Sequence, residues 1–395
     1  MRTALGTLAA GLVVLTVGTA GCGSDSPPPP PAVDVSQLDV GSYATAPREI
    51  GKPGFDRARL SEGQRMGNFV PLPTDVDPRF TVQIISDIST TRGFIETLSS
   101  LGLSDDSFRA TTPGFIAGFS STAYTERDLL IATSLENTVL LFADQQAATR
   151  AADALTQAFA TEKGFSEPVN IGKYPDAHAI WKPGTQELYS FQASGQYVIH
   201  TAIRDEAKKV LDTVDLPAMV ALVEKSIDTV GARLREFRPT PPDKLTDTPL
   251  DHDGMLGRAL PRPNEDGWRN PPGLYDRAGA PHLSRDPAQD KKLFDEAGVD
   301  WMAYNAGYLY RARDRKGAQL IRDSHGALSK LYRPIDPPRN LPDARCREFR
   351  PKDALVPRFH CAVSFDRYTA EVTSDQLIDV YQRISAQYAI LTRAK

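Results

Sequence analysis

The stretch Asn137-Thr-Val-Leu-Leu-Phe-Ala-Asp144 has a counterpart later in the chain, Gly307-Tyr-Leu-Tyr-Arg-Ala-Arg-Asp314. Each reads as a β-strand that ends beside an aspartate, a residue type that favours helix N-caps because its carboxylate accepts backbone N–H bonds. We expect the first cap to start a helix that buries Ala148, Ala151, Ala152, Leu155 and Phe159. The second helix is predicted to extend to about Tyr332.

A hairpin is predicted after each of these helices. The first spans Tyr189–Thr201, with its turn at Ser194-Gly195, and the second spans Phe359–Val372, with its turn at Phe365-Asp366. A further helix follows each hairpin, because apolar residues recur there at helical spacing. The helix over Leu216–Phe237 would bury Met219, Leu222, Val223, Ile227, Val230 and Leu234. The helix from Ser374 would bury Leu377, Val380, Tyr381, Ile384, Tyr388 and Leu391.

The two copies keep nearly the same spacing. The caps lie 170 residues apart (144 to 314), and the hairpin tyrosines Tyr197 and Tyr368 lie 171 apart. We therefore predict an α+β fold made of tandem β-α-β-β-α units, each an antiparallel sheet with helices on one face, as in ferredoxin-like folds. The alternative is a chance likeness of two α+β stretches.

Composition divides the chain into five segments. They are a leader over 1–21, a proline-rich tether over 22–45, an N-terminal α+β domain over 46–238, a proline-rich connector over 239–283 and a C-terminal α+β domain over 284–395. Within the N-terminal domain, helices are predicted over Arg57–Phe69 and Thr91–Leu101, and a strand over Leu129–Ala132.

The first 22 residues resemble a bacterial lipoprotein leader. Arg2 precedes an uncharged run, Ala4–Ala20, of the length of a signal-peptide core. Thr19-Ala-Gly-Cys22 then places small residues before a cysteine, which predicts lipid attachment to Cys22. The alternatives are a plain signal peptide and a short uncleaved anchor. Five prolines at 27–31 favour a stiff polyproline spacer that lifts a domain off a membrane surface.

Cysteine use fits an oxidising compartment. With Cys22 lipidated, an even pair remains, Cys346 and Cys361, in strand-like sequence 15 residues apart. We expect them to form a disulfide; a redox pair or half of a metal site is the alternative.

Net charge limits the kinds of partner. The chain carries 46 basic and 50 acidic side chains, a net charge of −4. Nucleic-acid binding requires a basic surface that displaces counterions from phosphate, so no nucleic-acid partner is expected.

Seven stretches together resemble an uncharacterised lipoprotein family of mycobacteria, nocardiae and their relatives, which is defined by a domain of unknown function. The resemblance implies a location in the cell envelope and assigns no reaction. It is carried by Gly41-Ser-Tyr-Ala-Thr-Ala-Pro, Gln64-Arg-Met with Asn68-Phe-Val, Asp75-Val-Asp-Pro, Asp253-Gly-Met-Leu-Gly-Arg-Ala-Leu-Pro, Ala297-Gly-Val-Asp, Phe365-Asp-Arg-Tyr and Ala386-Gln-Tyr-Ala-Ile-Leu.

Residues with catalytic or metal-binding chemistry are scattered. Asp251-His-Asp-Gly lacks the later ligands of a calcium loop and is interpreted as a turn. Gly118-Phe-Ser-Ser-Thr lacks the second glycine of a hydrolase nucleophile turn. No catalytic residue, metal or cofactor is therefore assigned. The histidines, interpreted as core or surface residues, are His178, His200, His252, His282, His325 and His360.

The hairpin aromatics could line a ligand groove, although such residues more often form sheet core. We therefore expect a lipid-anchored protein on the extracytoplasmic face of the cell membrane that binds an envelope protein or a small ligand. One alternative is a cell-wall or lipid hydrolase, which a buried histidine bonded to a cleft Ser or Asp would favour. Another is a structural scaffold, which a broad apolar surface patch without a cleft would favour. The aromatics are Tyr189, Phe191, Tyr197, Phe359, Phe365 and Tyr368.

Overall fold

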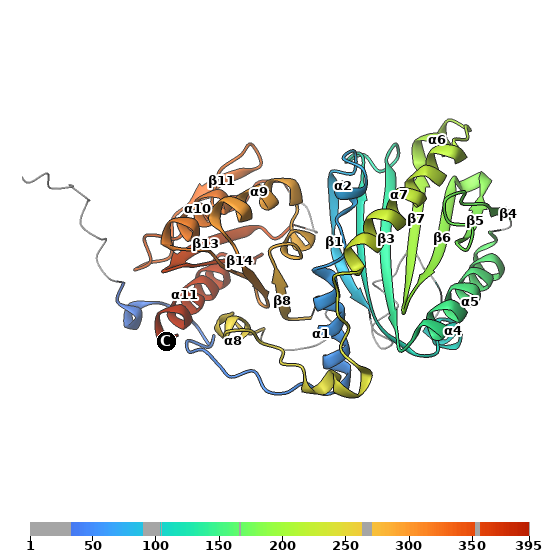
Figure 1. The fold of residues 1–395 in the computed structure, drawn as a ribbon. Coiled ribbons are helices and arrows are strands. Elements are labelled where there is room, and N and C mark those ends of the chain that lie inside the picture. Colours follow the sequence, from blue (N-terminus) through green and yellow to red (C-terminus); the bar gives the residue numbers. More distant parts are fainter. Residues whose placement is uncertain are drawn as a thin grey trace, which may run out of the picture.

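The computed structural model describes residues 33–89, 103, 105–165, 167–262, 271–351 and 356–394. The leader, Cys22 and the helix predicted over 91–101 lie outside the described residues. Figure 1 shows two antiparallel sheets side by side, one formed by each half of the chain. Within the described residues, no helix combines the length and apolar character needed to cross a bilayer.

The first sheet has seven strands in the order β1-β2-β3-β7-β6-β5-β4. Every neighbouring pair is antiparallel. The strands are β1 (Val82–Ser89), β2 (Phe115–Tyr124), β3 (Thr133–Phe142), β4 (Glu167–Val169), β5 (His178–Lys182), β6 (Glu187–Ser194) and β7 (Tyr197–Asp205).

The second sheet repeats this order. Read from its β8 edge, the order is β8-β9-β10-β14-β13-β12-β11, so each strand takes the place of the strand seven numbers earlier. This identity of order supports the predicted duplication. The strands are β8 (Gly273–Asp276), β9 (Trp301–Tyr304), β10 (Tyr308–Arg311), β11 (Tyr332–Ile335), β12 (Arg345–Phe349), β13 (Phe359–Phe365) and β14 (Tyr368–Ser374).

Helices cover both faces of the first sheet. Helix α5 (Gln145–Lys163) is capped by the Asp144 carboxylate, and its predicted apolar stripe packs on the face that carries Leu140 and Phe142. Helix α7 (Leu216–Leu234) packs on the opposite face, against Leu135 and Ile203. Short helices α2 (Pro73–Val76), α4 (Asp105–Thr111) and α6 (Glu206–Val210) and the 3₁₀ turns η2 (Pro183–Thr185) and η3 (Pro242–Asp247) complete this half.

The second sheet is covered in the same way. Helix α10 (Arg315–His325), capped by Asp314, lies with α9 (Pro287–Ala297) on one face, and α11 (Leu377–Arg393) packs on the other. The expected arrangement had the helices of each unit on one face; in both halves they lie on opposite faces. Helix α8 (Met255–Arg258) and the 3₁₀ turn η4 (Ala280–Leu283) complete the half.

Several local predictions are confirmed and others are wrong. Both hairpins form, and their turns begin with left-handed residues, Gly195 and Asp366. Leu129–Ala132 is not a strand but the turn between β2 and β3. The helix after Asp314 ends at His325, because Tyr332 starts β11. Leu377, expected in the core, is exposed.

Two segments from the first part of the chain pack against the C-terminal half. Helix α1 (Phe55–Gly67), close to the predicted 57–69, contacts both β2 and β8 and lies between the sheets (Figure 1). Residues 33–50, which include the 3₁₀ turn η1 (Val35–Gln37), form a strap that packs on the C-terminal half through Leu38 and Val40. We call the boundary between the two halves the seam; one hydrophobic cluster crosses it, with Phe119 and Val139 on one side and Phe294 and Tyr310 on the other.

Candidate functional site

A cavity of about 370 Å³ lies at the seam. Helix α1 forms one wall, β8 and Trp301 of β9 form another, and the segment 248–252 between η3 and α8 completes the lining. This volume is within the range of small-molecule sites, which occur preferentially between domains. The lining residues are Ser61, Gln64, Arg65, Asn68, Phe69, Thr248, Pro249, Leu250, Asp251, His252, Leu274, Asp276 and Trp301.

The acidic groups of the cavity are already engaged by backbone donors. The Asp251 carboxylate accepts from the N–H groups of Leu256 (2.7 Å) and Gly257 (2.9 Å), so it holds the start of α8. Asp276 accepts from the N–H groups of Ala278 and Gly279. Burial raises the pKa of Asp276 despite these donors. Both carboxylates therefore shape the cavity wall, and neither forms an acid–base pair with the other.

The amides of the cavity join the two halves. The Gln64 side chain donates to the carbonyl of Pro271 (2.8 Å), and the Asn68 side-chain oxygen accepts from the N–H of Asp276 (3.2 Å). Each bond connects α1 or its end to the chain around β8, more than 200 residues later. The cavity is therefore held open by the same contacts that fix the seam.

The cavity presents an aromatic surface whose position is set by an ionic network. The ring of His252 lies 4.7 Å from that of Trp301. Its neighbour Asp253 pairs with Arg311 (3.0 Å), whose other side pairs with Asp300 (2.8 Å). These bonds raise the pKa of the buried Arg311 and lower that of Asp253, so both stay charged. The aromatic surface can stack on a flat group of a ligand.

Polar clusters also lie outside the cavity, and the first is a buried serine and histidine. His282 Nδ1 is 3.0 Å from Ser121 Oγ, and its Nε2 is 2.8 Å from the carbonyl of Val70. A carbonyl only accepts, so Nε2 carries the proton and Nδ1 accepts from the serine hydroxyl. This is a Ser–His pair of the kind hydrolases use, but both residues have no exposed surface. It connects the first sheet to η4 inside the core and does not face a cleft.

The second cluster is charged and lies between α9, α10 and the second sheet. His325 Nδ1 is 2.9 Å from Glu371, and its Nε2 is 3.6 Å from Asp290, which accepts from Ser284 Oγ (2.6 Å). Burial opposes a charge on His325, but Glu371 and Asp290 outweigh it and raise its pKa to about 10. His360 lies on the other side of Glu371, at 4.0 Å.

The first half has an uncharged leucine and histidine at the corresponding places. Leu155 comes eleven residues after the Asp144 cap, as His325 does after Asp314, and His200 comes three residues after Tyr197, as Glu371 does after Tyr368. Leu155 is buried without charge, and burial lowers the pKa of His200 to about 3, which keeps it neutral. The fold therefore does not require ions at these positions.

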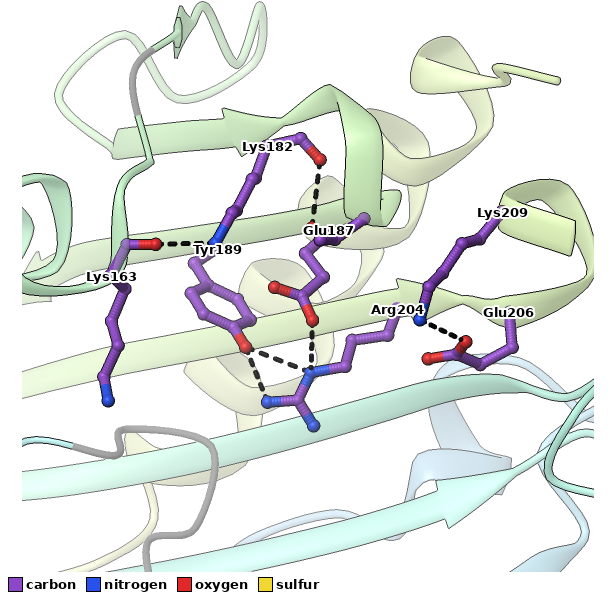
Figure 2. A network of polar contacts seen from close by, with 8 residues as sticks. Lys163, Lys182, Glu187, Tyr189, Arg204, Glu206 and Lys209 are labelled. Carbon is purple, nitrogen blue, oxygen red and sulfur yellow. Dashed lines mark hydrogen bonds and ion pairs between the residues drawn. The ribbon is translucent and has the colours of Figure 1, made fainter. Parts of the chain in front are cut away.

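A third network stabilises one end of the first sheet (Figure 2). Arg204 donates from two nitrogens to the hydroxyl of Tyr189 (3.0 and 2.6 Å) and lies 3.4 Å from Glu187. Burial raises the pKa of Tyr189 to about 12, so the hydroxyl stays neutral. Lys182 donates to the carbonyl of Lys163, the last residue of α5. These bonds connect β5, β6 and β7 with α5.

The sequence-predicted residues fall mostly in structural roles. Cys346 and Cys361 are cross-strand neighbours on β12 and β13 and form the expected disulfide. Asp251-His-Asp-Gly is the turn before α8, and Gly118-Phe-Ser-Ser-Thr lies inside β2. His200, His282, His325 and His360 are buried, and His178 and His252 are half exposed. The hairpin aromatics pack in or against the sheet cores.

Sequence reasoning missed the cavity. Phe69, Leu274 and Trp301, which give it apolar walls, were not singled out. Two of the stretches that carry the family resemblance, Gln64 to Val70 and Asp253 to Pro261, nevertheless line or adjoin it. In the described part of the chain, no group of three or more histidine, cysteine or carboxylate side chains is arranged to hold a metal ion.

The fold and its site define an α+β protein of two antiparallel sheets with the same strand order, an arrangement that fits duplication, and with a cavity between its halves. The chain belongs to the family described as Domain of unknown function (DUF7373): the N-terminal part of that family matches residues 50–250, and its C-terminal part matches residues 255–394. The boundary between the two matches falls beside the cavity segment 248–252. No curated protein matches the chain.

Proposed function

We propose that this protein is a lipid-anchored protein of the cell envelope that binds a small, largely apolar ligand in the seam cavity. The observation that carries the binding proposal is the cavity between the two halves, with Trp301 and His252 on one wall and its carboxylates engaged by backbone N–H groups. Such a site can take up a flat apolar group. Its histidine, His252, lies 3.1 Å from the Asp253 carboxylate, which the Arg311 guanidinium also engages.

The envelope location is supported by the leader and the tether. Thr19-Ala-Gly-Cys22 provides the thiol and small residues that lipidation requires, and the prolines at 27–31 separate it from the strap. The disulfide is consistent with an oxidising compartment. Two acyl chains on Cys22 would hold the protein durably on the outer face of the membrane.

Mass spectrometry of the protein isolated from cells tests the anchor. The wild type and the neighbouring Ser24→Ala should carry a diacylglycerol on Cys22, whereas Cys22→Ala should carry no lipid. A wild type with an unmodified Cys22 would contradict the lipid anchor.

Mass spectrometry of the purified native protein tests the ligand. We expect organic extracts of the wild type to contain a compound in near-stoichiometric amount, and Trp301→Ala to lose most of it. The control is Leu331→Ala, an exposed leucine that is not part of the cavity lining. Extracts without any such compound, or a compound that remains in equal amount in Trp301→Ala, would refute binding at this cavity.

A further inference from the structure

The turn between β2 and β3 exposes three consecutive aliphatic side chains, Leu129, Leu130 and Ile131. Hydrogen bonds fix the backbone of this turn. The N–H of Leu130 donates to the side chain of Asp128, and the N–H of Ile131 donates to its carbonyl. Ala132, the next residue, is buried. The aliphatic side chains therefore protrude from a fixed backbone.

A second apolar turn lies beside the first. Val210, Leu211 and Val214 are exposed at the end of α6 and in the loop to α7. This loop is closed by the N–H of Thr213, which bonds to the carbonyl of Lys208, with Asp212 left-handed between them. The two turns are connected by a bond from the N–H of Glu206 to the carbonyl of Ala132.

We call these six side chains the apolar tips. They lie at the end of the first sheet where α6 begins (Figure 1). The Arg204 network holds the end of β7 directly before α6, and Glu206 pairs with Lys209 on α6 itself (Figure 2). The apolar tips therefore extend from a part of the fold that hydrogen bonds and ion pairs hold in place.

Their exposure requires an explanation. Eleven large hydrophobic side chains are strongly exposed in the described residues, and six of them are the apolar tips, at 53–73%. Consecutive exposed aliphatic residues promote association and do not persist without a function. The tips contain no Trp, Tyr or Arg, the residue types that dominate protein–protein hot spots. Leu, Ile and Val are instead favourable in hydrocarbon.

We propose that the apolar tips insert into the surface of a lipid bilayer. The surrounding charges specify the kind of surface: residues 125–132 and 205–215 contain six acidic and three basic side chains. This surplus repels anionic headgroups, so insertion is driven by apolar burial and favours zwitterionic lipid. The contact belongs to the N-terminal half, whereas the strap packs on the C-terminal half, so it is separate from any anchor on Cys22.

Vesicle flotation tests the proposal with a chain that begins at Ser24, which contains every described element and lacks the leader and Cys22. It should float with phosphatidylcholine vesicles in low and high salt, and less well when phosphatidylglycerol is added. Leu130→Ser with Leu211→Ser should weaken partitioning at least about tenfold. Leu328→Ser with Leu331→Ser, an exposed pair in the other half, is the matched control and should bind like the wild type.

Circular dichroism should show both double variants folded, because all four leucines lie outside the core. Absence of flotation, equal flotation of the two double variants, or binding restricted to anionic vesicles and abolished by salt would overturn the proposal. So would a wild-type dimer in solution that the tip variant loses, since a second copy would then cover the tips.

Discussion

Ser121 Oγ on β2 and His282 Nδ1 in η4 lie 3.0 Å apart, and this bond joins the first sheet to the second half inside a fully buried environment. The other imidazole nitrogen donates to the carbonyl of Val70. Burial lowers the pKa of His282 to about 4, so the ring is neutral at ordinary pH. Protonation would convert the accepting nitrogen into a donor and place a charge in the seam.

The first prediction concerns acid sensitivity. The pKa of His282 is lower in the folded than in the unfolded state, so its contribution to stability is complete above about 6.5 and is lost as pH falls toward about 4. His200 acts in the same direction. His282→Gln keeps a donor for Val70 and an acceptor for Ser121 but does not titrate. In urea unfolding, the free energy of unfolding of this variant should fall by roughly 3 kcal/mol less than that of the wild type as the pH is lowered from 6.5 to 4. Equal pH dependence of the two proteins would contradict this role.

The second prediction concerns the charged cluster. Glu371→His leaves the buried His325 cation facing another imidazole and should cost roughly 3–5 kcal/mol of unfolding free energy. His325→Leu combined with Glu371→His reproduces the first half's pair, Leu155 and His200, and should recover more than half of that loss. Denaturant titration of both variants and wild type measures it. If the double variant instead lost as much unfolding free energy as the two single substitutions together, the charged cluster of His325 and Glu371 would be required for folding.

The third prediction compares two helical glycines. A Cβ on Gly67 would lie 2.4 Å from the ring of Phe119, which is itself packed against His282. Gly67→Ala should therefore destabilise by about 1–3 kcal/mol. Gly231 in α7 has its nearest side-chain atom at 3.9 Å, so Gly231→Ala should stabilise by about 1 kcal/mol through helix propensity. Thermal melting of both variants measures the difference in stability. If Gly67→Ala were stabilising as Gly231→Ala is, α1 would be able to shift easily at the seam.

The fourth prediction concerns the disulfide. Cys346→Ser with Cys361→Ser opens a loop of 15 residues and should lower the unfolding free energy by roughly 3 kcal/mol. The fold should remain, because β12 and β13 stay paired by backbone bonds. Reductant should lower the melting temperature of the wild type and leave that of the double variant unchanged. If reductant, added so that it also reaches the unfolded chain, left the melting temperature of the wild type unchanged, the disulfide would contribute no stability.

Local signals in the sequence predict the elements well but not their assembly. The caps Asp144 and Asp314 and both hairpins could be found because each depends on neighbouring residues. The equal spacing of the helix caps and of the hairpin tyrosines predicted two copies, which the common strand order fits. Edge strands such as β4 and β11 are short and partly exposed, and they lack alternation that would distinguish them from loops. Leu129–Ile131 has the composition of a strand, but the ladder ends at Thr133 and leaves these residues outside it.

The cavity could not be predicted in this way. Gln64 and Pro271, or Asn68 and Asp276, meet across more than 200 residues, and no local pattern encodes such pairs. The same holds for the charged cluster, where His325 and Glu371 come from different elements. Their counterparts, Leu155 and His200, lie at matching offsets from the caps and the hairpin tyrosines, and the common strand order places them at equivalent positions.

The strap gives the chain an unusual order of assembly. Its partners are supplied by the far end of the polypeptide: Tyr43 bonds to Asp379, and Arg393 donates to Thr45. A chain that emerges from a ribosome or a translocon with its beginning first must keep the strap undocked until α11 has followed. Docking of α11, and not folding of the first half, is therefore the event that completes the contacts of the strap.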